Sequence, residues 1–215
     1  MVNKLKTFMP LAAMLFIGVS YSGAYFSDSV SISNNTFSTG DLNPPVVVEV
    51  GEIIITEFMA NPAAVSDSLG EYFEIYNSSS SDINLKGWRY RDNGIGNWNL
   101  ISEDLIISAG SYMVFVASDN SLINGGIAGG YKFASSFNIT NTKDEILIQK
   151  PDGNGGWIEV DRIAYDKNDI DWDIVSGISN QLKDLSSDNL DTGSWNLSTT
   201  EYGVGDLGTP GGPNV

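Results

Sequence analysis

The pattern of apolar and polar residues from Glu52 onward predicts an all-β domain. Short runs rich in Ile, Val, Tyr, Phe and Trp recur between clusters of Gly, Asn, Asp and Ser, and no window of ten or more residues has apolar positions at helical spacing. The expected strands are residues 52–58, 72–77, 83–90, 98–101, 112–117, 131–133, 145–150 and 157–165. About eight short strands separated by frequent turns are typical of a β-sandwich.

The last of these expected strands changes its side-chain parity partway along. Ile158 and Val160 share one face of an extended chain, whereas Ile163 and Tyr165 share the other. This change predicts a bulge, or a crossing between two sheets, near residues 161–162.

The first residues have the three-part layout of a secretory signal. Two lysines and no acid precede an apolar run at residues 11–19, and the small residues Ser22 and Ala24 stand at the −3 and −1 positions of a cut between Ala24 and Tyr25. The run is shorter than the roughly 20 residues that cross a bilayer. A cleaved signal peptide at residues 1–24, containing the signal helix, is therefore favoured over the alternative, an uncleaved membrane anchor.

An extended linker is expected at residues 25–51, before the folded domain at residues 52–215. It is rich in Ser and Asn, and Pro44 and Pro45 fix φ and exclude a helix. Export has further support from two motifs, G-A-Y-F-S-D at residues 23–28 and N-T-F-S-T-G-D-L at 35–42. They resemble the export and N-terminal region of the camelysin and biofilm-matrix fibre family of Gram-positive bacteria.

Composition excludes several chemistries. The 215 residues contain no Cys and no His, so disulfide frameworks, Cys nucleophiles, Ser-His-Asp triads and His-ligated zinc are all absent. Eleven basic and twenty-seven acidic side chains give a net charge of −16, which becomes −18 when residues 1–24 and their two lysines are removed. A nucleic-acid partner is not expected, because Lys and Arg are too few for a broad phosphate-binding patch.

Ordered motifs along the folded part resemble the lamin tail domain family. They are I-I-T-E-F-M-A-N-P at residues 54–62, G-E-Y-F-E-I-Y-N at 70–77, I-N-L-K-G-W at 83–88, A-G-S-Y-M-V at 109–114, V-D-R-I-A-Y at 160–165 and G-T-P-G-G-P-N at 208–214. The resemblance implies an immunoglobulin-like β-sandwich. In bacteria it also implies a secreted or envelope protein in which the domain serves as a binding or attachment module.

The densest acidic cluster is a candidate calcium site and comprises Asp166, Asp169, Asp171 and Asp173. Carboxylate oxygens on a loop are the ligands that calcium requires, and the last three aspartates mimic the start of an EF-hand loop. The mimicry then fails, because Ile174 stands where a glycine should make the turn and Asn180 where a bidentate Glu is needed. A solvated acidic face is favoured over calcium binding, and no other cofactor is expected.

Two nearby glutamates suggest an acid/base pair of the kind used in glycoside hydrolysis. Glu71 and Glu74 lie three residues apart, so they point to opposite faces and cannot converge on one substrate atom. A catalytic pair would need a carboxylate from another strand, such as Glu57. The favoured interpretation is structural, with one glutamate satisfying buried backbone groups and the other facing water. No catalytic residue is assigned.

An aromatic and basic run is a candidate platform for a sugar ring or a peptide. Trp88, Tyr90 and Trp98 alternate with Arg89 and Arg91. Because the two arginines share a face opposite Trp88 and Tyr90, a half-buried strand with exposed arginines paired to nearby acids is favoured. The remaining tryptophans are interpreted as packing residues: Trp157, Trp172 and Trp195.

The expected function is a secreted, non-enzymatic binding or attachment module of the cell surface or extracellular matrix. Its expected partner is a surface or matrix protein or a polysaccharide, and membrane contact is expected only through an uncleaved N-terminal segment. Two alternatives remain open. One is a self-assembling structural or matrix-fibre subunit, suggested by the N-terminal resemblance and by exposed strand edges. The other is a carboxylate-based hydrolase, which would need two acids within roughly 5 to 9.5 Å.

Overall fold

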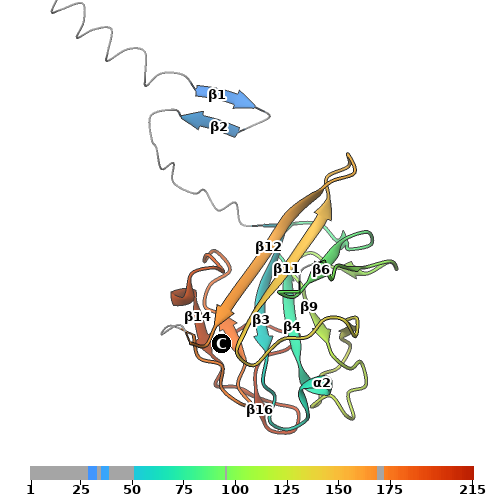
Figure 1. The fold of residues 1–215 in the computed structure, drawn as a ribbon, viewed down its shortest axis with the longest axis vertical. Coiled ribbons are helices and arrows are strands. Elements are labelled where there is room, and N and C mark those ends of the chain that lie inside the picture. Colours follow the sequence, from blue (N-terminus) through green and yellow to red (C-terminus); the bar gives the residue numbers. More distant parts are fainter. Residues whose placement is uncertain (1–28, 33–34, 39–50, 95, 169–171) are drawn as a thin grey trace, which may run out of the picture. The chain divides into compact units, whose positions relative to one another are not determined.

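The computed structural model divides the chain into two compact units, residues 1–47 and 48–215 (Figure 1). In the first unit, β1 (Ser29–Ile32) pairs with β2 (Asn35–Ser38) in an antiparallel hairpin. The residues that the structure describes are 29–32, 35–38, 51–94, 96–168 and 172–215. The expected signal peptide and its cut between Ala24 and Tyr25 lie outside them. Within the described ranges, no helix has the length and apolar character that crossing a membrane requires.

The second unit is an immunoglobulin-like β-sandwich of two sheets (Figure 1). The larger sheet has the order β10-β9-β4-β3-β13-β14, and the smaller has the order β12-β11-β6-β7. The larger sheet contains β3 (Ile53–Met59), β4 (Tyr72–Asn77), β9 (Tyr112–Val116), β10 (Tyr131–Lys132), β13 (Asn180–Leu182) and β14 (Trp195–Leu197). The smaller contains β6 (Arg89–Arg91), β7 (Asn99–Leu100), β11 (Lys143–Pro151) and β12 (Trp157–Asp166). Neighbouring strands are antiparallel except β9 and β10, which are parallel.

Shorter elements lie outside the two main sheets. The pairs are β5 (Ile83–Asn84) with β8 (Ile106–Ile107) and β15 (Glu201–Tyr202) with β16 (Asp206–Leu207), and the short helices are α2 (Asp67–Gly70) and a 3-10 turn (Thr192–Ser194). The strand expected over residues 83–90 is divided into β5 and β6. The division occurs because Gly87 adopts φ 85° and Trp88 N–H closes a turn onto the Leu85 carbonyl at 2.9 Å.

The core lies between the inner faces of the two sheets. Phe58 on β3 stacks on Tyr165 of β12 with ring centroids 4.8 Å apart, and Phe73 on β4 lies 6.2 Å from Tyr90 of β6. Each of these side chains is 2% exposed or less. Complete burial of such a side chain stabilises the fold by roughly 1.5–3 kcal/mol. Alternating apolar positions on the strands therefore hold the sheets face to face.

The predicted bulge in β12 is confirmed next to its expected position. Ile148 of β11 lies opposite Asp161, but the following Gln149 lies opposite Glu159. Val160 is thus the extra residue, immediately before residues 161–162. The bulge turns the side chains on either side of it to different faces, and it sets which residues of β12 point outward from the smaller sheet.

Candidate functional site

The outer face of the smaller sheet gathers every arginine of the chain. Arg89 and Arg91 project from β6, and Arg162 projects from β12. Their positions follow from strand pairing, because Arg91 and Arg162 are both opposite Leu147 of β11. We call this surface the arginine face, and its further members are Trp98, Leu100, Glu145, Gln149, Trp157 and Glu159.

A stacked triple of side chains forms the centre of the arginine face. The Arg89 guanidinium carbon lies 3.8 Å from the ring centroid of Trp98 and 3.9 Å from that of Trp157. Arg89 Nε and Nη2 both donate to Gln149 Oε1, at 2.9 and 2.6 Å. A cation over an indole face is attracted by the ring quadrupole. The two rings and the amide together hold Arg89 in one orientation.

The other two arginines are neutralised by neighbouring acids. Arg91 Nη2 lies 2.7 Å from Glu145 Oε1, and Arg162 contacts both Glu145 at 3.4 Å and Glu159 at 3.2 Å. Among the described residues, Arg89 is the arginine without a carboxylate partner. Desolvation and the nearby charge of Arg91 lower the pKa of Arg89 from its ordinary value, but a guanidinium keeps its proton in proteins. The face therefore presents one uncompensated positive charge.

The opposite outer face, on the larger sheet, contains two buried carboxylates. Glu57 on β3 and Glu74 on β4 are cross-strand partners, and neither side chain is exposed. Residues 208–214, which we call the closing segment, supply backbone donors to both. Gly208 of this segment packs directly against Tyr72 and Glu57. A Cβ at this position would lie 2.3 Å from the Tyr72 hydroxyl and 2.8 Å from Glu57 Oε1, so no larger residue fits without a shift.

Glu57 accepts hydrogen bonds from three parts of the chain. Its Oε1 accepts from the Tyr72 hydroxyl at 2.7 Å, from Thr209 N–H at 2.9 Å and from the Ser179 hydroxyl. Its Oε2 accepts from the Thr209 hydroxyl at 3.0 Å. A buried carboxylate is tolerated when its lone pairs are satisfied in this way.

Glu74 is the second carboxylate that holds the closing segment on the sheet. It accepts from the Thr56 hydroxyl at 2.7 Å and from Gly211 N–H at 2.6 Å. Burial, followed by the charge of Glu57, raises the pKa of Glu74 to about 8. At neutral pH the Glu74 carboxyl is therefore mostly protonated, which relieves repulsion between the two groups.

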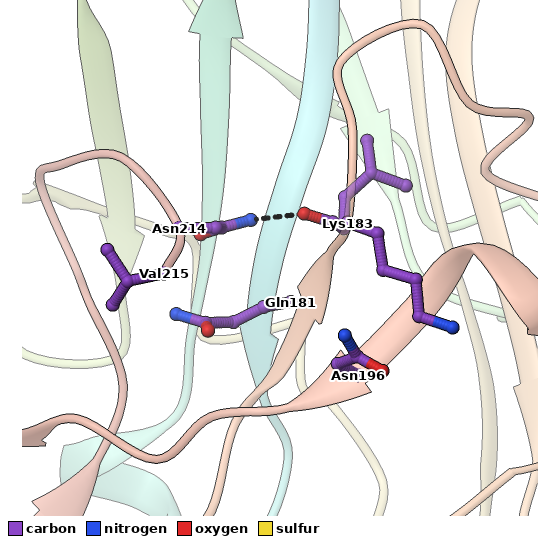
Figure 2. A pocket seen from close by; sticks show the side chains of 6 residues that line it. Gln181, Lys183, Asn196, Asn214 and Val215 are labelled. Carbon is purple, nitrogen blue, oxygen red and sulfur yellow. Dashed lines mark hydrogen bonds between the residues drawn. The ribbon is translucent and has the colours of Figure 1, made fainter.

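Asn214 fastens the end of the closing segment to the sheet. Its Nδ2 donates to the Thr56 carbonyl at 2.8 Å and to the Leu182 carbonyl at 2.9 Å. Figure 2 shows the second of these bonds at the rim of a hollow of about 100 Å³, with Gln181 and Asn196 beside it. The hollow is small and lined by amides, and the segment that borders it is held in place.

The structure confirms one part of the glutamate interpretation and corrects another. Glu71 and Glu74 do lie on opposite faces, because Glu71 accepts from Ile139 N–H at 3.0 Å while Glu74 bonds to the closing segment. The expectation that one of them faces water is wrong, since Glu71 is 6% exposed and Glu74 is 0% exposed. Glu57 is the cross-strand carboxylate, but it too is covered. A substrate atom therefore cannot reach the pair in this state.

The acidic cluster is described only in part. Asp166 accepts from Asn168 N–H at 2.9 Å and pairs with Lys143 at 3.1 Å, and these contacts lower its pKa. Asp173 is exposed, and Asp169 and Asp171 lie outside the described residues. In the part of the chain that the structure describes, no three or more acidic side chains converge on a position for a metal ion. Calcium binding by the four aspartates stays a prediction.

The tryptophan interpretations are confirmed for the core and wrong at one position. Trp88, Trp172 and Trp195 are between 5% and 7% exposed, as packing residues should be. Trp157 is 37% exposed and stacks on Arg89 instead. The sequence held a partial signal for this: Trp157 alternates in phase with the charged Glu159, and the bulge expected near residues 161–162 puts both out of phase with the buried Ile163.

Comparison with known proteins gives a family. The model of the family described as Lamin Tail Domain matches residues 48–167, more than half of the chain. No curated protein matches it. The matched residues contain the whole arginine face together with Glu57 and Glu74, while residues 172–215 add β13, β14 and the closing segment. Members of this family are immunoglobulin-like domains without enzymatic activity, and the chain belongs to the lamin tail domain family.

Proposed function

We propose that this protein is a secreted, non-enzymatic module that attaches to the cell surface or the extracellular matrix through its arginine face. The observation that carries the proposal is the stack of Trp98, Arg89 and Trp157. It places an uncompensated cation and an exposed indole on the open side of a sandwich whose other outer face holds buried carboxylates beneath the closing segment.

The arginine face has the features of a preformed binding surface. Trp157 is 37% exposed and Leu100 is 58% exposed, so apolar area remains available to a partner. Arg89 is already held by two rings and Gln149, so its ordering on binding forfeits little side-chain entropy. Rigid aromatic anchors of this kind contribute most of the affinity in many interfaces.

The strand edges favour the face over edge pairing as the route of attachment. The end strands β7 and β10 have two residues each, and β14 has three. The long end strand β12 is interrupted by the bulge at Val160. Short and bulged edges discourage the addition of a further strand. Self-assembly into fibres through these edges is therefore the less favoured function.

Export can be tested separately from attachment. The full chain, produced in a secreting bacterial host, should be recovered outside the cytoplasm with Tyr25 as its first residue, as determined by mass spectrometry of the intact protein. Protein that stays in the membrane with residues 1–24 attached would support the anchored form. Protein that stays in the cytoplasm would contradict secretion.

Attachment is tested by co-sedimentation of residues 25–215 with isolated cell envelopes of the producing organism. The wild type should sediment with the envelopes, and a variant combining Arg89→Gln with Trp157→Ala should stay in solution. Lys132→Gln is the matched control, because it removes one positive charge from an exposed position on the other sheet. Equal sedimentation of the double variant and the wild type would overturn the proposal.

A further inference from the structure

The guanidinium of Arg89 keeps a defined set of donors free for a partner. Arginine has five N–H groups in a planar fork. Gln149 takes one from Nε and one from Nη2, and the two indole rings cover both flat faces. Among the described residues, nothing accepts from Nη1. The two Nη1 donors and the second Nη2 donor therefore remain at the outer end of the fork.

This free end has the geometry of a carboxylate receptor. One N–H from Nη1 and one from Nη2 are parallel, and they match the two oxygens of a carboxylate in a bidentate pair. Gln149 fixes the rotation of the fork about its own axis, and the two rings fix its plane. A carboxylate would meet these donors without any rearrangement of the side chain.

The neighbouring groups indicate what the carboxylate is attached to. Arg89 stacks on one face of Trp157, yet this residue is 37% exposed, and an indole ring has an electron-rich face. The C–H groups on the flat side of a pyranose ring carry partial positive charge, so they pack favourably against such a surface. Because Arg89 occupies one face of this ring, a sugar ring would pack on the other face, and the carboxylate of a neighbouring sugar in the same polysaccharide chain would reach Arg89.

The surrounding charge selects against dense polyanions. Glu145 and Glu159 lie on the same face as Arg89, and the chain has a net charge of −16. A polyphosphate carries closely spaced charges, so it would meet strong repulsion from this field along its whole length. In a uronate polysaccharide the carboxylates are separated by at least a whole sugar ring, so the repulsion per length is weaker and one carboxylate can pair with Arg89.

We propose that the arginine face binds uronate-bearing polysaccharide, with a uronate carboxylate on the free end of Arg89 and a neighbouring sugar ring against the face of Trp157 that Arg89 does not cover. This inference rests on the proposed attachment function and names its ligand class. The contact between the carboxylate and Arg89 is a local ion pair. Binding should therefore weaken as salt is added, but the net charge of the protein should not determine whether binding occurs.

The experiment is calorimetric titration of residues 25–215 with an oligogalacturonate, using maltohexaose as the neutral sugar and polyphosphate as the dense anion. Wild-type protein should bind the oligogalacturonate and neither of the others. Arg89→Gln should weaken binding at least tenfold, and Arg89→Lys, which keeps the charge but loses the fork, should weaken it nearly as much. Lys132→Gln should bind like the wild type. Thermal unfolding of each variant confirms that it is folded.

The outcomes separate this inference from the function on which it rests. Absence of oligogalacturonate binding, equal binding of maltohexaose, or binding that Arg89→Gln leaves unchanged would each overturn the ligand assignment. If Arg89-dependent sedimentation with envelopes persists in that case, the attachment function stands with another ligand. Concentration-dependent dimers that require Arg89 and exclude the oligosaccharide would also overturn the assignment, in favour of a second copy of the chain.

Discussion

The two outer faces of the sandwich differ in whether their charged side chains are buried or open to solvent. On the larger sheet, Glu57 and Glu74 are fully buried and hydrogen bonded to the closing segment. On the smaller sheet, Arg89 stands between two rings with part of its fork open to solvent. The difference shows which charges hold the fold together and which are available to a partner, although neither property can be read from the residue types.

The energetic reason lies in desolvation. A carboxylate removed from water is destabilising unless donors replace its hydration, so the donors around Glu57 are required wherever it is buried. Arg89 keeps contact with solvent, and its stacking and single amide partner contribute modestly to folding. Substitutions on the larger sheet should therefore act on stability, and substitutions on the arginine face should act on binding.

The largest expected effect is that of Glu57→Ala. It leaves the Tyr72 and Ser179 hydroxyls and the Thr209 backbone and hydroxyl donors without their acceptor. Each buried unsatisfied donor costs about 1–3 kcal/mol, so the free energy of unfolding should fall by at least about 3 kcal/mol in urea unfolding at pH 7.

Glu159→Ala is the matched control for Glu57→Ala. The side chain of Glu159 is 47% exposed and pairs with Arg162 at the surface. Exposed pairs contribute about 0–1 kcal/mol, so this variant should unfold nearly like the wild type. If the two variants lost equal stability, burial would not be the difference between the two faces.

The next effect is a dependence of stability on pH. Burial is the main cause that raises the pKa of Glu74 to about 8 and the pKa values of Glu71 and Asp161 to about 7. Between the unfolded and folded pKa values the folded chain binds more protons, so stability falls as pH rises. Below about pH 4 the three groups should make their full contribution to the free energy of unfolding. By pH 8 the free energy of unfolding should be lower by at least about 2 kcal/mol.

Glu74→Gln tests the origin of this pH dependence. The amide resembles the protonated carboxyl, with its oxygen facing Gly211 N–H and its NH₂ facing the Thr56 hydroxyl oxygen. The fall in stability between pH 5 and pH 8 should become shallower, as followed by urea unfolding at several pH values. A slope as steep as that of the wild type would show that Glu74 is not protonated in the folded state.

A smaller effect is expected for Asn214→Ala. The substitution leaves the Thr56 and Leu182 carbonyls without a donor, which should lower the free energy of unfolding by about 1–2 kcal/mol. Asn196→Ala is the control, since Asn196 lines the same hollow but is exposed (Figure 2). It should change thermal unfolding by less than about 0.5 kcal/mol. If both variants lost the same free energy of unfolding, Asn214 would not be the residue that holds the closing segment on the sheet.

The sequence predicts the parts of the fold that depend on local alternation. The strands β3, β4, β9, β11 and β12 follow runs of apolar residues, and the inward direction of Tyr90 against the outward direction of Arg89 follows from parity alone. β13 was missed because Asn180 and Gln181 are polar yet buried through long-range bonds. No local pattern marks a strand of that kind.

The candidate site was harder to predict because its contacts join distant segments. Trp157 meets Arg89 only after β12, β11 and β6 have paired in a particular register. Glu57 likewise meets Thr209, which is 152 positions further along the chain. Residue types alone indicated the aromatic and basic platform and made Glu57 a candidate cross-strand acid. Strand pairing decides that the platform is exposed and that Glu57 is buried.

The smallest effect on stability, and the sharpest test of the comparison, is expected for Trp157→Ala. The side chain is 37% exposed and its stacking on Arg89 is near the surface, so the free energy of unfolding should fall by only about 0.5 kcal/mol. Oligogalacturonate binding should nevertheless weaken at least tenfold, because the ring that receives the sugar is lost and Arg89 gains freedom to move. Trp157→Phe, which keeps a ring, should recover part of the affinity. A variant that lost stability without losing affinity would place Trp157 among the packing residues, and the arginine face would then resemble the closed face of the larger sheet.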